Sequence, residues 1–431
     1  MKRLVPTAVA VLCLALSASP VAAHHHGSGG NAGDLDPTWQ GTGWSTTSFP
    51  GADSLADGVA VGRDGRVVAV GGTSDGTTED FAVSRYNADG SLDTSFGSGG
   101  RVTTDFKGGA DFATGVALVR GGLVVVGYTA ASDGTVSLAL ARYQVDGSLD
   151  PSFGGSGEVV TSISGMDFAR AVALSGHHIV VAGSTASGAN GDDFLVARYN
   201  LDGTPDSGFG GHGWVSTDFN GADDQANAVL VTGRDILVAG TARGTSNDFA
   251  LARYRGDGSL DPWFGTGGKV ETDFSGGNDA ANALDEQHGR IVAIGSAAGA
   301  ADADMAAAVY DWRGHPDRHF SGDGMATMDL GKDEAGFGGG FDRNGAVIAG
   351  GNSADSVGAF AVVRWTASGD PDPRFGGGTG HVVTPIGGDS SALAVARGLD
   401  GKLVLAGFAD NDFALARYVV ESDHHRQFGG H

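Results

Sequence analysis

The chain has almost no cysteine and no long hydrophobic run. Its 431 residues include one cysteine, Cys13, which lies in an N-terminal segment that we expect to be removed. After that segment no stretch reaches 18 uninterrupted apolar residues, the length that a membrane-spanning helix needs. We therefore predict a mature protein without disulfides, cysteine metal sites or membrane insertion, stabilised by packing alone.

Basic residues are also scarce, with 27 Lys and Arg against 51 Asp and Glu, and the formal net charge is −24 at pH 7. Nucleic acids and anionic membrane surfaces repel such a polyanion, so we expect no nucleic-acid partner. Because Asp is a preferred turn residue, we interpret most of this charge as belonging to surface turns. An extracellular protein or a polysaccharide is the expected partner of a chain that we expect to be monomeric.

The N-terminus has the pattern of a secretory signal peptide over residues 1–23. Lys2 and Arg3 precede an apolar run, and Val21 to Ala23 supply a small-residue cleavage site. Residues 24–35 are predicted to be a flexible leader. Cleavage after Ala23 would place His26 third in the mature chain, which resembles an amino-terminal copper/nickel motif, although a plain tail is the favoured interpretation. We assign residues 36–431 to one domain and expect a secreted, extracellular protein.

What the chain does contain is a repeat. The phrase Leu149-Asp150-Pro151-Ser152-Phe153-Gly154 recurs, and its aspartates are spaced by 57, 57, 56, 55, 56 and 55 residues. A fixed period of about this length indicates a repeat architecture. The seven aspartates are Asp36, Asp93, Asp150, Asp206, Asp261, Asp317 and Asp372.

Four short strands are expected between successive copies of the phrase. In the second unit they lie at 113–118, 123–127, 138–143 and 158–161, each rich in β-branched or alternating residues and bounded by turn residues. Asp64-Gly65 and Asp400-Gly401 occupy positions where tight hairpin turns need positive φ. No amphipathic helix of useful length is present, so the sequence predicts an all-β fold with four antiparallel strands per unit.

The chain ends predict that the units form a closed ring. A strand of the fourth type, residues 43–47, precedes the first complete unit, and no such strand follows Tyr418. The spare N-terminal strand can complete the last unit, which gives a seven-bladed β-propeller. Small residues on one face of each first strand, such as Ala56, Gly58 and Ala60, place that strand next to the axis. A right-handed β-helix is the rival fold, but its coils are usually shorter.

The combination of the L-D-x-x-F-G phrase, the Val-Val-x-Gly strand and the F-A-L-A-R-Y strand resembles the delta-60 repeat family of bacterial secreted and surface propellers. The likeness covers essentially residues 36–428, and a looser one to kelch repeats rests on residues 70–72 and 349–351. The resemblance implies the propeller fold and an extracellular location, but no activity and no catalytic residues. Units five and six depart from the pattern, with Val309 in place of the arginine, Phe320-Ser321 in place of Phe-Gly, and residues 336–341 in place of the Ala/Val alternation.

Two sets of residues recur in nearly every unit, and we interpret them as structural. An arginine near the end of the third strand and an aspartate just before that strand are predicted to fix the blades through hydrogen bonds and ion pairs. The arginines are Arg85, Arg142, Arg198, Arg253, Arg364 and Arg417, and the aspartates are Asp80, Asp193, Asp248, Asp304 and Asp412. The Phe-Gly phrase and its aspartate are predicted to form the turn that links the blades.

Patterns that carry chemistry are few. Residues 72–76 match G-x-S-x-G, but a strand follows where a nucleophile elbow needs a helix. The turn at 87–93 has alternating oxygen ligands that suit Ca²⁺, yet it lacks the terminal Glu of an EF-hand, so we favour hydrogen bonding within the turn. No catalytic residue, metal ligand or cofactor is assigned, with Ca²⁺ kept as the alternative.

Residues that break the repeat are the remaining candidates. His315, His319 and Asp323, together with Asp285, Glu286 and His288 of the preceding strand and turn, are compatible with a one-sided metal or acid–base site, and drift in a degenerate unit is the favoured alternative. Trp39, Trp44, Trp214, Trp263 and Trp312 are expected to be exposed aromatics that stack on sugars or, preferably, pack against the next blade.

The leading functional hypothesis is a non-enzymatic secreted binding or scaffold protein. The alternative is an extracellular propeller enzyme, a hydrolase or lyase acting on glycans or esters. An enzyme should concentrate titratable, non-repeated residues at one mouth of the central channel, which is the feature that separates the two hypotheses.

Overall fold

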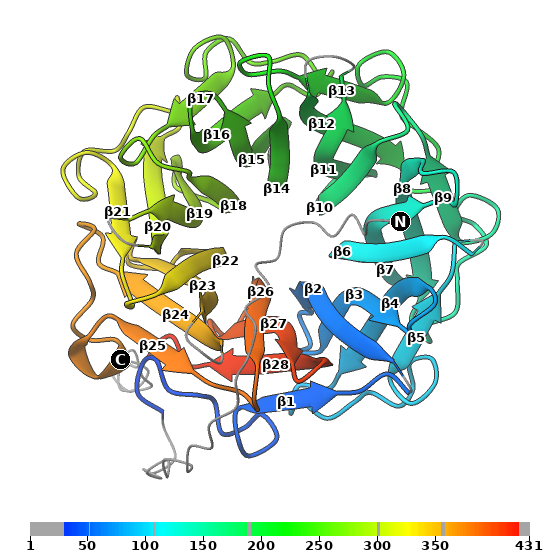
Figure 1. Ribbon diagram of the computed structural model, residues 1–431, viewed down its shortest axis with the longest axis horizontal. Helices are drawn as coiled ribbons and strands as arrows, with labels where there is room; N and C mark the ends of the chain where they lie inside the picture. The colour runs from blue at the N-terminus through cyan, green and yellow to red at the C-terminus, as the bar shows by residue number, and fades with distance from the viewer. Residues whose placement is uncertain are drawn as a thin grey trace, which may run out of the picture.

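Seven four-stranded antiparallel sheets surround a central axis in a computed structural model of the protein (Figure 1). The structure describes residues 30–50, 52–106, 108–187, 191–299, 302–354 and 358–421. Within these residues helical structure is limited to the short 3-10 turn η2 (Gly376–Gly378). The predicted all-β, seven-bladed propeller with four strands per blade is confirmed.

Each blade runs from an inner strand at the axis to an outer strand at the rim. Blade 1 contains β2 (Asp53–Val61), β3 (Val67–Ser74), β4 (Glu79–Tyr86) and β5 (Arg101–Thr104). Blade 2 contains β6 (Ala110–Val119), β7 (Gly122–Ala130), β8 (Val136–Gln144) and β9 (Glu158–Thr161). Blade 3 contains β10 (Asp167–Ser175), β11 (His178–Ala186), β12 (Asp192–Asn200) and β13 (Trp214–Thr217). Blade 4 contains β14 (Asp224–Thr232), β15 (Asp235–Arg243), β16 (Asn247–Tyr254) and β17 (Lys269–Thr272).

The remaining three blades complete the circle. Blade 5 contains β18 (Ala280–Gln287), β19 (Arg290–Ala298), β20 (Ala303–Asp311) and β21 (Met325–Met328). Blade 6 contains β22 (Asp333–Phe341), β23 (Val347–Ala354), β24 (Ala359–Trp365) and β25 (His381–Thr384). Blade 7 contains β26 (Ser390–Arg397), β27 (Leu403–Ala409) and β28 (Asp412–Tyr418), with β1 (Trp44–Thr47) as its fourth strand.

The N-terminal strand closes the ring as predicted. In blade 7, β1 pairs antiparallel with β28, and Trp44 lies opposite Ala416. Contacts continue N-terminally before Asp36, where the array was predicted to begin, because the backbone N–H of Gly33 donates to the carbonyl of Val419 at 2.8 Å. The predicted signal peptide and residues 24–29 of the leader lie outside the described residues.

Small residues allow the inner strands to approach one another around the axis. Gly58 on β2 shows the constraint, because a Cβ atom there would lie 2.8 Å from the side chain of Val70 and 3.0 Å from the carbonyl oxygen of Thr114 in the next blade. Ala56 and Ala113, at equivalent places on β2 and β6, are fully buried. The prediction that the first strand of each unit lies at the axis is confirmed (Figure 1).

The hydrophobic core is divided among the junctions between blades. Each of seven buried clusters draws side chains from two adjacent blades. The cluster between blades 7 and 1 joins Phe413 and Leu415 to Ala69 and Trp39. Trp39 was listed among the exposed aromatics and is fully buried instead, but the favoured packing against the neighbouring blade is confirmed, because Trp39 replaces the phenylalanine of the linker phrase and fills the same junction.

The linker phrase ties each blade to the next, as predicted. The N–H of Gly97 donates to the carbonyl of Asp146 in blade 2, and equivalent bonds join the following blades. Blade 5, where the glycine is replaced, keeps this bond, since Ser321 adopts a φ of 54° and donates to the carbonyl of Ser368. The departure from the repeat therefore leaves the linkage intact.

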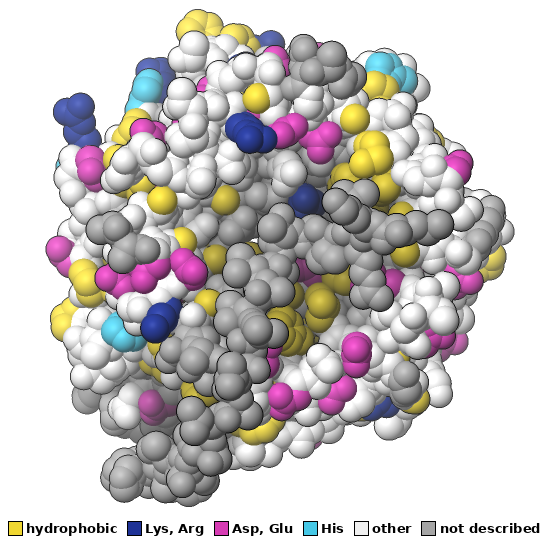
Figure 2. Space-filling model, viewed as in Figure 1, with side chains coloured by type: hydrophobic (Ala, Val, Ile, Leu, Met, Phe, Trp, Pro, Cys, Tyr) yellow, Lys and Arg dark blue, Asp and Glu magenta, His cyan; other side chains and the backbone are white. Residues whose placement is uncertain are grey.

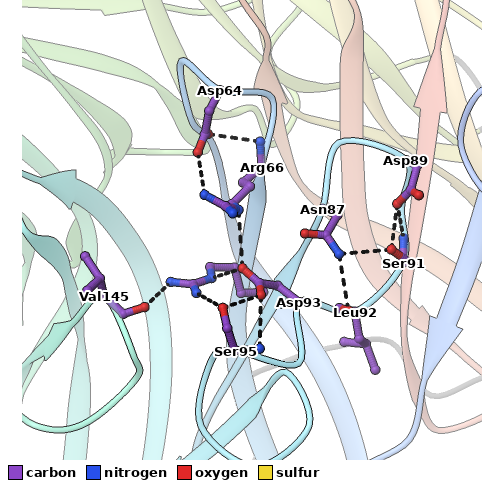
Figure 3. A network of polar contacts seen from close by, with 10 residues as sticks. Asp64, Arg66, Asn87, Asp89, Ser91, Leu92, Asp93, Ser95 and Val145 are labelled. Atoms are coloured by element: carbon purple, nitrogen blue, oxygen red, sulfur yellow. Dashed lines mark hydrogen bonds and ion pairs between the residues drawn. The ribbon is translucent and has the colours of Figure 1, made fainter.

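The repeated arginine clamps neighbouring blades together. Arg85 pairs with Asp93 of its own linker at 2.9 Å and donates to the carbonyl of Val145 in blade 2 at 2.6 Å (Figure 3). Five further arginines repeat this pairing with the linker aspartate, and they are Arg142, Arg198, Arg253, Arg364 and Arg417. In blade 5, where Val309 replaces the arginine, Arg290 of the adjacent strand binds Asp317 at 2.8 Å.

The prediction for the aspartates just before the third strand was wrong in one respect. Asp80, Asp193, Asp248 and Asp304 make no ion pair with any of the residues that the structure describes. Asp80 and Arg85 lie five residues apart on an extended strand, roughly 16 Å at about 3.3 Å per residue. They therefore sit at opposite ends of the blade, and the arginines reach the linker aspartates instead, with Asp342 as a further partner of Arg364.

The clamp predicts an unequal effect of two arginines that pair with Asp261. Arg253 is nearly buried, so replacing it with Met should lower the free energy of unfolding by about 3–5 kcal/mol, because Asp261 loses its buried partner. Arg255 lies at an exposed position and pairs with Asp261 at 3.6 Å. Arg255→Met should therefore change the free energy of unfolding by less than about 1 kcal/mol. Chemical denaturation of both variants measures the difference, and equal losses would contradict the clamp.

Candidate functional site

Seven side chains line the central channel at one structural position. Each is the extra residue of a β-bulge in an inner strand, where the pairing with the second strand shifts by one. A bulge leaves one residue unpaired and re-aims its side chain. We call these residues the channel ring, and they are Asp57, Thr114, Arg170, Asn227, Asn282, Phe337 and Leu393. They line a cavity of about 270 Å³.

Part of the channel ring is structural. Thr114 donates from its hydroxyl to the carbonyl of Ala169 at 2.9 Å, and the amide groups of Asn227 and Asn282 donate to carbonyls of the following blade at 3.0 Å. Arg170 donates to the side-chain oxygen of Gln225 at 3.3 Å, again in the following blade. These bonds hold adjacent inner strands together across the bulges.

Two members of the channel ring are not fully engaged by such bonds. The Nε of Arg170 is buried and has no hydrogen-bond partner among the described residues. Burial raises the pKa of Asp57 to about 6, although the positive charge of Arg170 opposes the shift. The ring thus carries one titratable acid and one cation on blades 1 and 3.

Blades 1 and 2 add further titratable groups near Asp57. Burial, with the negative charges of Glu79 and Asp57, raises the pKa of Tyr128 to about 12. The ring of Tyr128 lies 5.1 Å from that of Phe168, centroid to centroid. Burial, with the charge of Asp111, also raises the pKa of Glu79. Titratable residues of blades 1 to 3 thus interact with one another, and of these Asp57 and Arg170 line the channel cavity.

A larger hollow of about 530 Å³ lies between blades 1 and 2. Its lining includes Arg85, Ser95 and Val145, which belong to the repeated clamp shown in Figure 3. Because equivalent residues clamp the other junctions, we regard this hollow as a by-product of blade packing. The channel ring is the better candidate for a specific site.

The cluster predicted around His315 does not form a common site among the described residues. His315 contacts Asp311 at 3.2 Å, and the backbone of His319 donates to Asp317. On the neighbouring strand, Asp285 accepts a hydrogen bond from the backbone of Phe341 at 2.8 Å.

The other members of that cluster also serve their own turns. Glu286 accepts from the backbone of Gly289, and Asp323 accepts from that of Met325. His288 adopts a φ of 55° in the same turn as Glu286. Each residue thus stabilises local structure, which agrees with the interpretation of drift in a degenerate unit.

Two of the predicted exposed tryptophans are exposed. Trp263 is 76% exposed and Trp312 is 52% exposed, and both flank the Arg253 clamp between blades 4 and 5. Trp44 and Trp214 are partly buried and pack against the core clusters of their blades. Trp263 and Trp312 are therefore the two of the five that an incoming sugar or protein can reach.

The turn at 87–93 uses its oxygen atoms internally, as we favoured. Asp89 accepts hydrogen bonds from the backbone and the hydroxyl of Ser91, at 3.0 and 2.6 Å (Figure 3). The G-x-S-x-G match is also a turn, since Ser74 ends β3 and accepts from the backbone of Gly76. Neither motif contributes to a site.

Metal-binding potential lies instead at the blade edges, where sequence reasoning did not place it. Among the described residues, four groups of three carboxylates each bring one oxygen per residue within 4.8 Å of the others. We call them the acidic triads, and they are Asp80, Asp105 and Asp111; Asp193, Asp218 and Asp224; Asp248, Asp273 and Asp279; and Asp302, Asp304 and Asp329. Acidic side chains also outnumber basic ones on the face seen in Figure 2.

Comparison with known proteins supports a β-propeller repeat family. Residues 62–96, 121–153, 178–209 and 235–264 match the model described as a domain of unknown function (DUF5122) β-propeller. Each matched segment contains the second and third strands of a blade and the linker phrase. A comparison with curated proteins finds no match.

Solved structures share the propeller fold at low identity. Sqt1 from Chaetomium thermophilum is 13% identical, with 86% of this chain and 97% of that chain covered and a TM-score of 0.46. The β-propeller domain of the Trilobed protease from Pyrococcus furiosus is 10% identical, with 86% and 97% covered and a TM-score of 0.43. A glucose dehydrogenase is 13% identical, with 71% and 96% covered and a TM-score of 0.40. Likeness at this level carries no functional argument.

Across the described residues, no helix has both the length and the apolar character needed to cross a membrane.

The raised pKa of Asp57 predicts a pH-dependent effect of Asp57→Asn. Because the folded-state pKa lies above the ordinary value of 3.8, ionisation destabilises the fold as pH rises from about 4 to about 6. At pH 7.5 the variant should gain up to about 3 kcal/mol, and near pH 4 the gain should vanish. Thermal unfolding at both pH values tests this, with Asp53→Asn at an exposed position of the same strand as control. An equal gain at both pH values would contradict the burial of an ionised Asp57.

Proposed function

We propose that the protein is a secreted binding or scaffold protein whose ligand contacts the channel ring. The main support for this proposal is that the residue type at the channel-ring position varies from blade to blade. Flanking inner-strand positions repeat Ala, Gly and Val, whereas the ring position holds Asp, Thr, Arg, Asn, Asn, Phe and Leu in turn. A position that served packing alone would be expected to repeat, so this diversity supports a role in recognition.

The chemistry of the ring favours a ligand rich in neutral hydrogen-bonding groups. Asp57 supplies an acceptor, the guanidinium group of Arg170 supplies donors, and Phe337 offers an aromatic face. The net charge of −24 disfavours polyanions. A neutral polysaccharide, or a segment of an extracellular protein, fits these properties best.

Secretion belongs to the same proposal. Its support is the N-terminal pattern of Lys2 and Arg3, an apolar run and a cleavage site at Ala23. The resemblance of the repeats to the delta-60 family points the same way. Detection of a mature N-terminus at His24 in the culture medium would support it.

An extracellular enzyme acting on glycans or esters is the second candidate, and one observation favours it. A carboxyl group with a pKa of about 6 is present in both protonation states near neutral pH, as a general acid–base catalyst requires. Asp57 is therefore a better candidate for such a role than His315 or His319. Turnover that Asp57→Asn abolishes would favour the enzyme.

The binding proposal predicts that Arg170 is needed for ligand capture. We expect the protein to bind members of an array of neutral plant and microbial oligosaccharides, and Arg170→Gln to weaken the best hit at least about tenfold through loss of a charged donor. Trp263→Ala removes an exposed aromatic side chain that is not part of the channel ring, and it should leave that affinity unchanged.

The reverse pattern, binding retained in Arg170→Gln and lost in Trp263→Ala, would contradict the channel as the binding site. It would move recognition to the junction of blades 4 and 5. Circular dichroism of both variants checks that each remains folded.

A further inference from the structure

Three of the acidic triads join segments of two neighbouring blades. In blade 1, Asp80 lies near the start of β4, Asp105 follows β5, and Asp111 lies at the start of the inner strand of blade 2. The triads of blades 3 and 4 occupy the same three positions, where the outer strand of one blade leads back to the inner strand of the next. The triad of blade 5 lies within its own blade, with Asp302 and Asp304 at the start of β20 and Asp329 after β21.

The spacing of the oxygens suits one shared cation. Ca²⁺ binds oxygen at about 2.3–2.6 Å, so two oxygens on opposite sides of one ion are about 4.6–5.2 Å apart. The triad oxygens lie within 4.8 Å of one another and thus need little movement to bind a single ion. An all-carboxylate set without His or Cys selects a hard cation.

No ion pair with Lys, Arg or His compensates the triads within the described part of the chain, in contrast to the linker aspartates. Asp93 is nearly buried and pairs with Arg85, whereas Asp111 is fully buried and pairs with no basic side chain.

Buried oxygens in two triads receive no hydrogen bond of good geometry from the described part of the chain. Asp111 accepts from the backbone of Phe106 with Oδ2, while its buried Oδ1 receives no hydrogen bond of good geometry from the described residues, although the hydroxyl of Thr129 lies near this carboxylate. The Oδ1 of Asp193, a residue that is 6% exposed, likewise receives none of good geometry, with the hydroxyl of Ser187 near its carboxylate. An unsatisfied buried carboxylate oxygen is costly, and it indicates a ligand that the protein itself does not supply.

The three positions change together across the repeats. In blades 1, 3, 4 and 5 all three hold Asp or Glu, with Glu334 at the third position of blade 5. In the other three blades at most one is acidic, and the sets are Ser137, Ser162 and Asp167; Ala359, Pro385 and Ser390; and Asp412, Ser48 and Ser54. At these three positions every blade has either three acidic residues or at most one. If each position had been substituted independently of the others, blades with two acidic residues would be expected as well.

Where a single acid remains, hydroxyl groups satisfy it. Asp167 accepts from the hydroxyls of Ser164 and Thr185, both at 2.7 Å. Asp412 accepts from the hydroxyl of Ser48 at 2.8 Å. Blades 2 and 7 thus satisfy their single acid with hydroxyl groups, whereas a triad brings three carboxylates together, a concentration of negative charge that a bound cation would neutralise.

We propose that the four acidic triads are Ca²⁺ sites, and that those of blades 1, 3 and 4 join the outer strand of one blade to the inner strand of the next. The exposed member of each triad, such as Asp105, leaves room for water to complete the coordination. The proposal does not depend on what the channel ring binds, and its test measures calcium alone.

Calorimetric titration of the metal-stripped protein with CaCl₂ at pH 7.5 tests the proposal. We expect about four Ca²⁺ per chain and a melting temperature that rises in CaCl₂ relative to EDTA. Asp105→Ser, which copies Ser162 of blade 2, should lower the stoichiometry by one. A variant with Asp105, Asp218, Asp273 and Asp329 all replaced by Ser should bind none.

Asp146→Ser is the matched control, because Asp146 is an exposed turn aspartate outside the triads that accepts from the backbone of Ser148. It should keep the full stoichiometry. The four replaced aspartates also accept backbone hydrogen bonds in their own turns, so each protein is compared with itself in EDTA and in CaCl₂. CaCl₂ should raise the melting temperature of the natural chain and leave that of the fourfold variant unchanged. Calcium uptake absent below millimolar concentration, or uptake that the fourfold variant retains, would overturn the proposal.

Discussion

Each blade packs only against its two neighbours, so the whole ring depends on the pairing of β1 with β28. This pairing joins strands that are more than 360 residues apart and completes both the sheet of blade 7 and the core between blades 7 and 1. Without it, two blade faces rich in buried apolar side chains would meet water. The Arg417–Asp36 pair at 2.6 Å adds the same clamp that fixes the other junctions.

Repetition and its exceptions separate structure from function in this protein. The clamp arginines and the linker bonds recur at nearly every junction, and where blade 5 lacks the arginine, Arg290 restores the contact from the adjacent strand. The channel ring shows the opposite behaviour, with a fixed backbone bulge and side chains that vary. The acidic triads are intermediate, since they occur in four blades, while the other three blades keep at most one of the three acids.

The repeat made the architecture predictable from sequence, because seven aligned copies reveal strand order, blade number and the spare strand at 43–47. The misplaced predictions share a cause. Trp39 was taken as exposed although it stands where Phe96 stands in the linker phrase, and that alignment could have placed it in the core. The bulge at Asp57 and the approach of Asp80 to Asp111 depend on how strands curve and meet in space, which no single unit of sequence reveals. The sequence did contain one signal for the channel ring, namely a variable position between the small residues of each inner strand.

Amide hydrogen exchange tests the closed ring most directly, because it reports protection of each strand without altering the chain. The account predicts that residues 44–47 exchange as slowly as residues 101–104, which form the same fourth strand within blade 1. Rapid exchange at 44–47, with 101–104 still protected, would show that the N-terminal strand does not complete blade 7 and would contradict the closed ring.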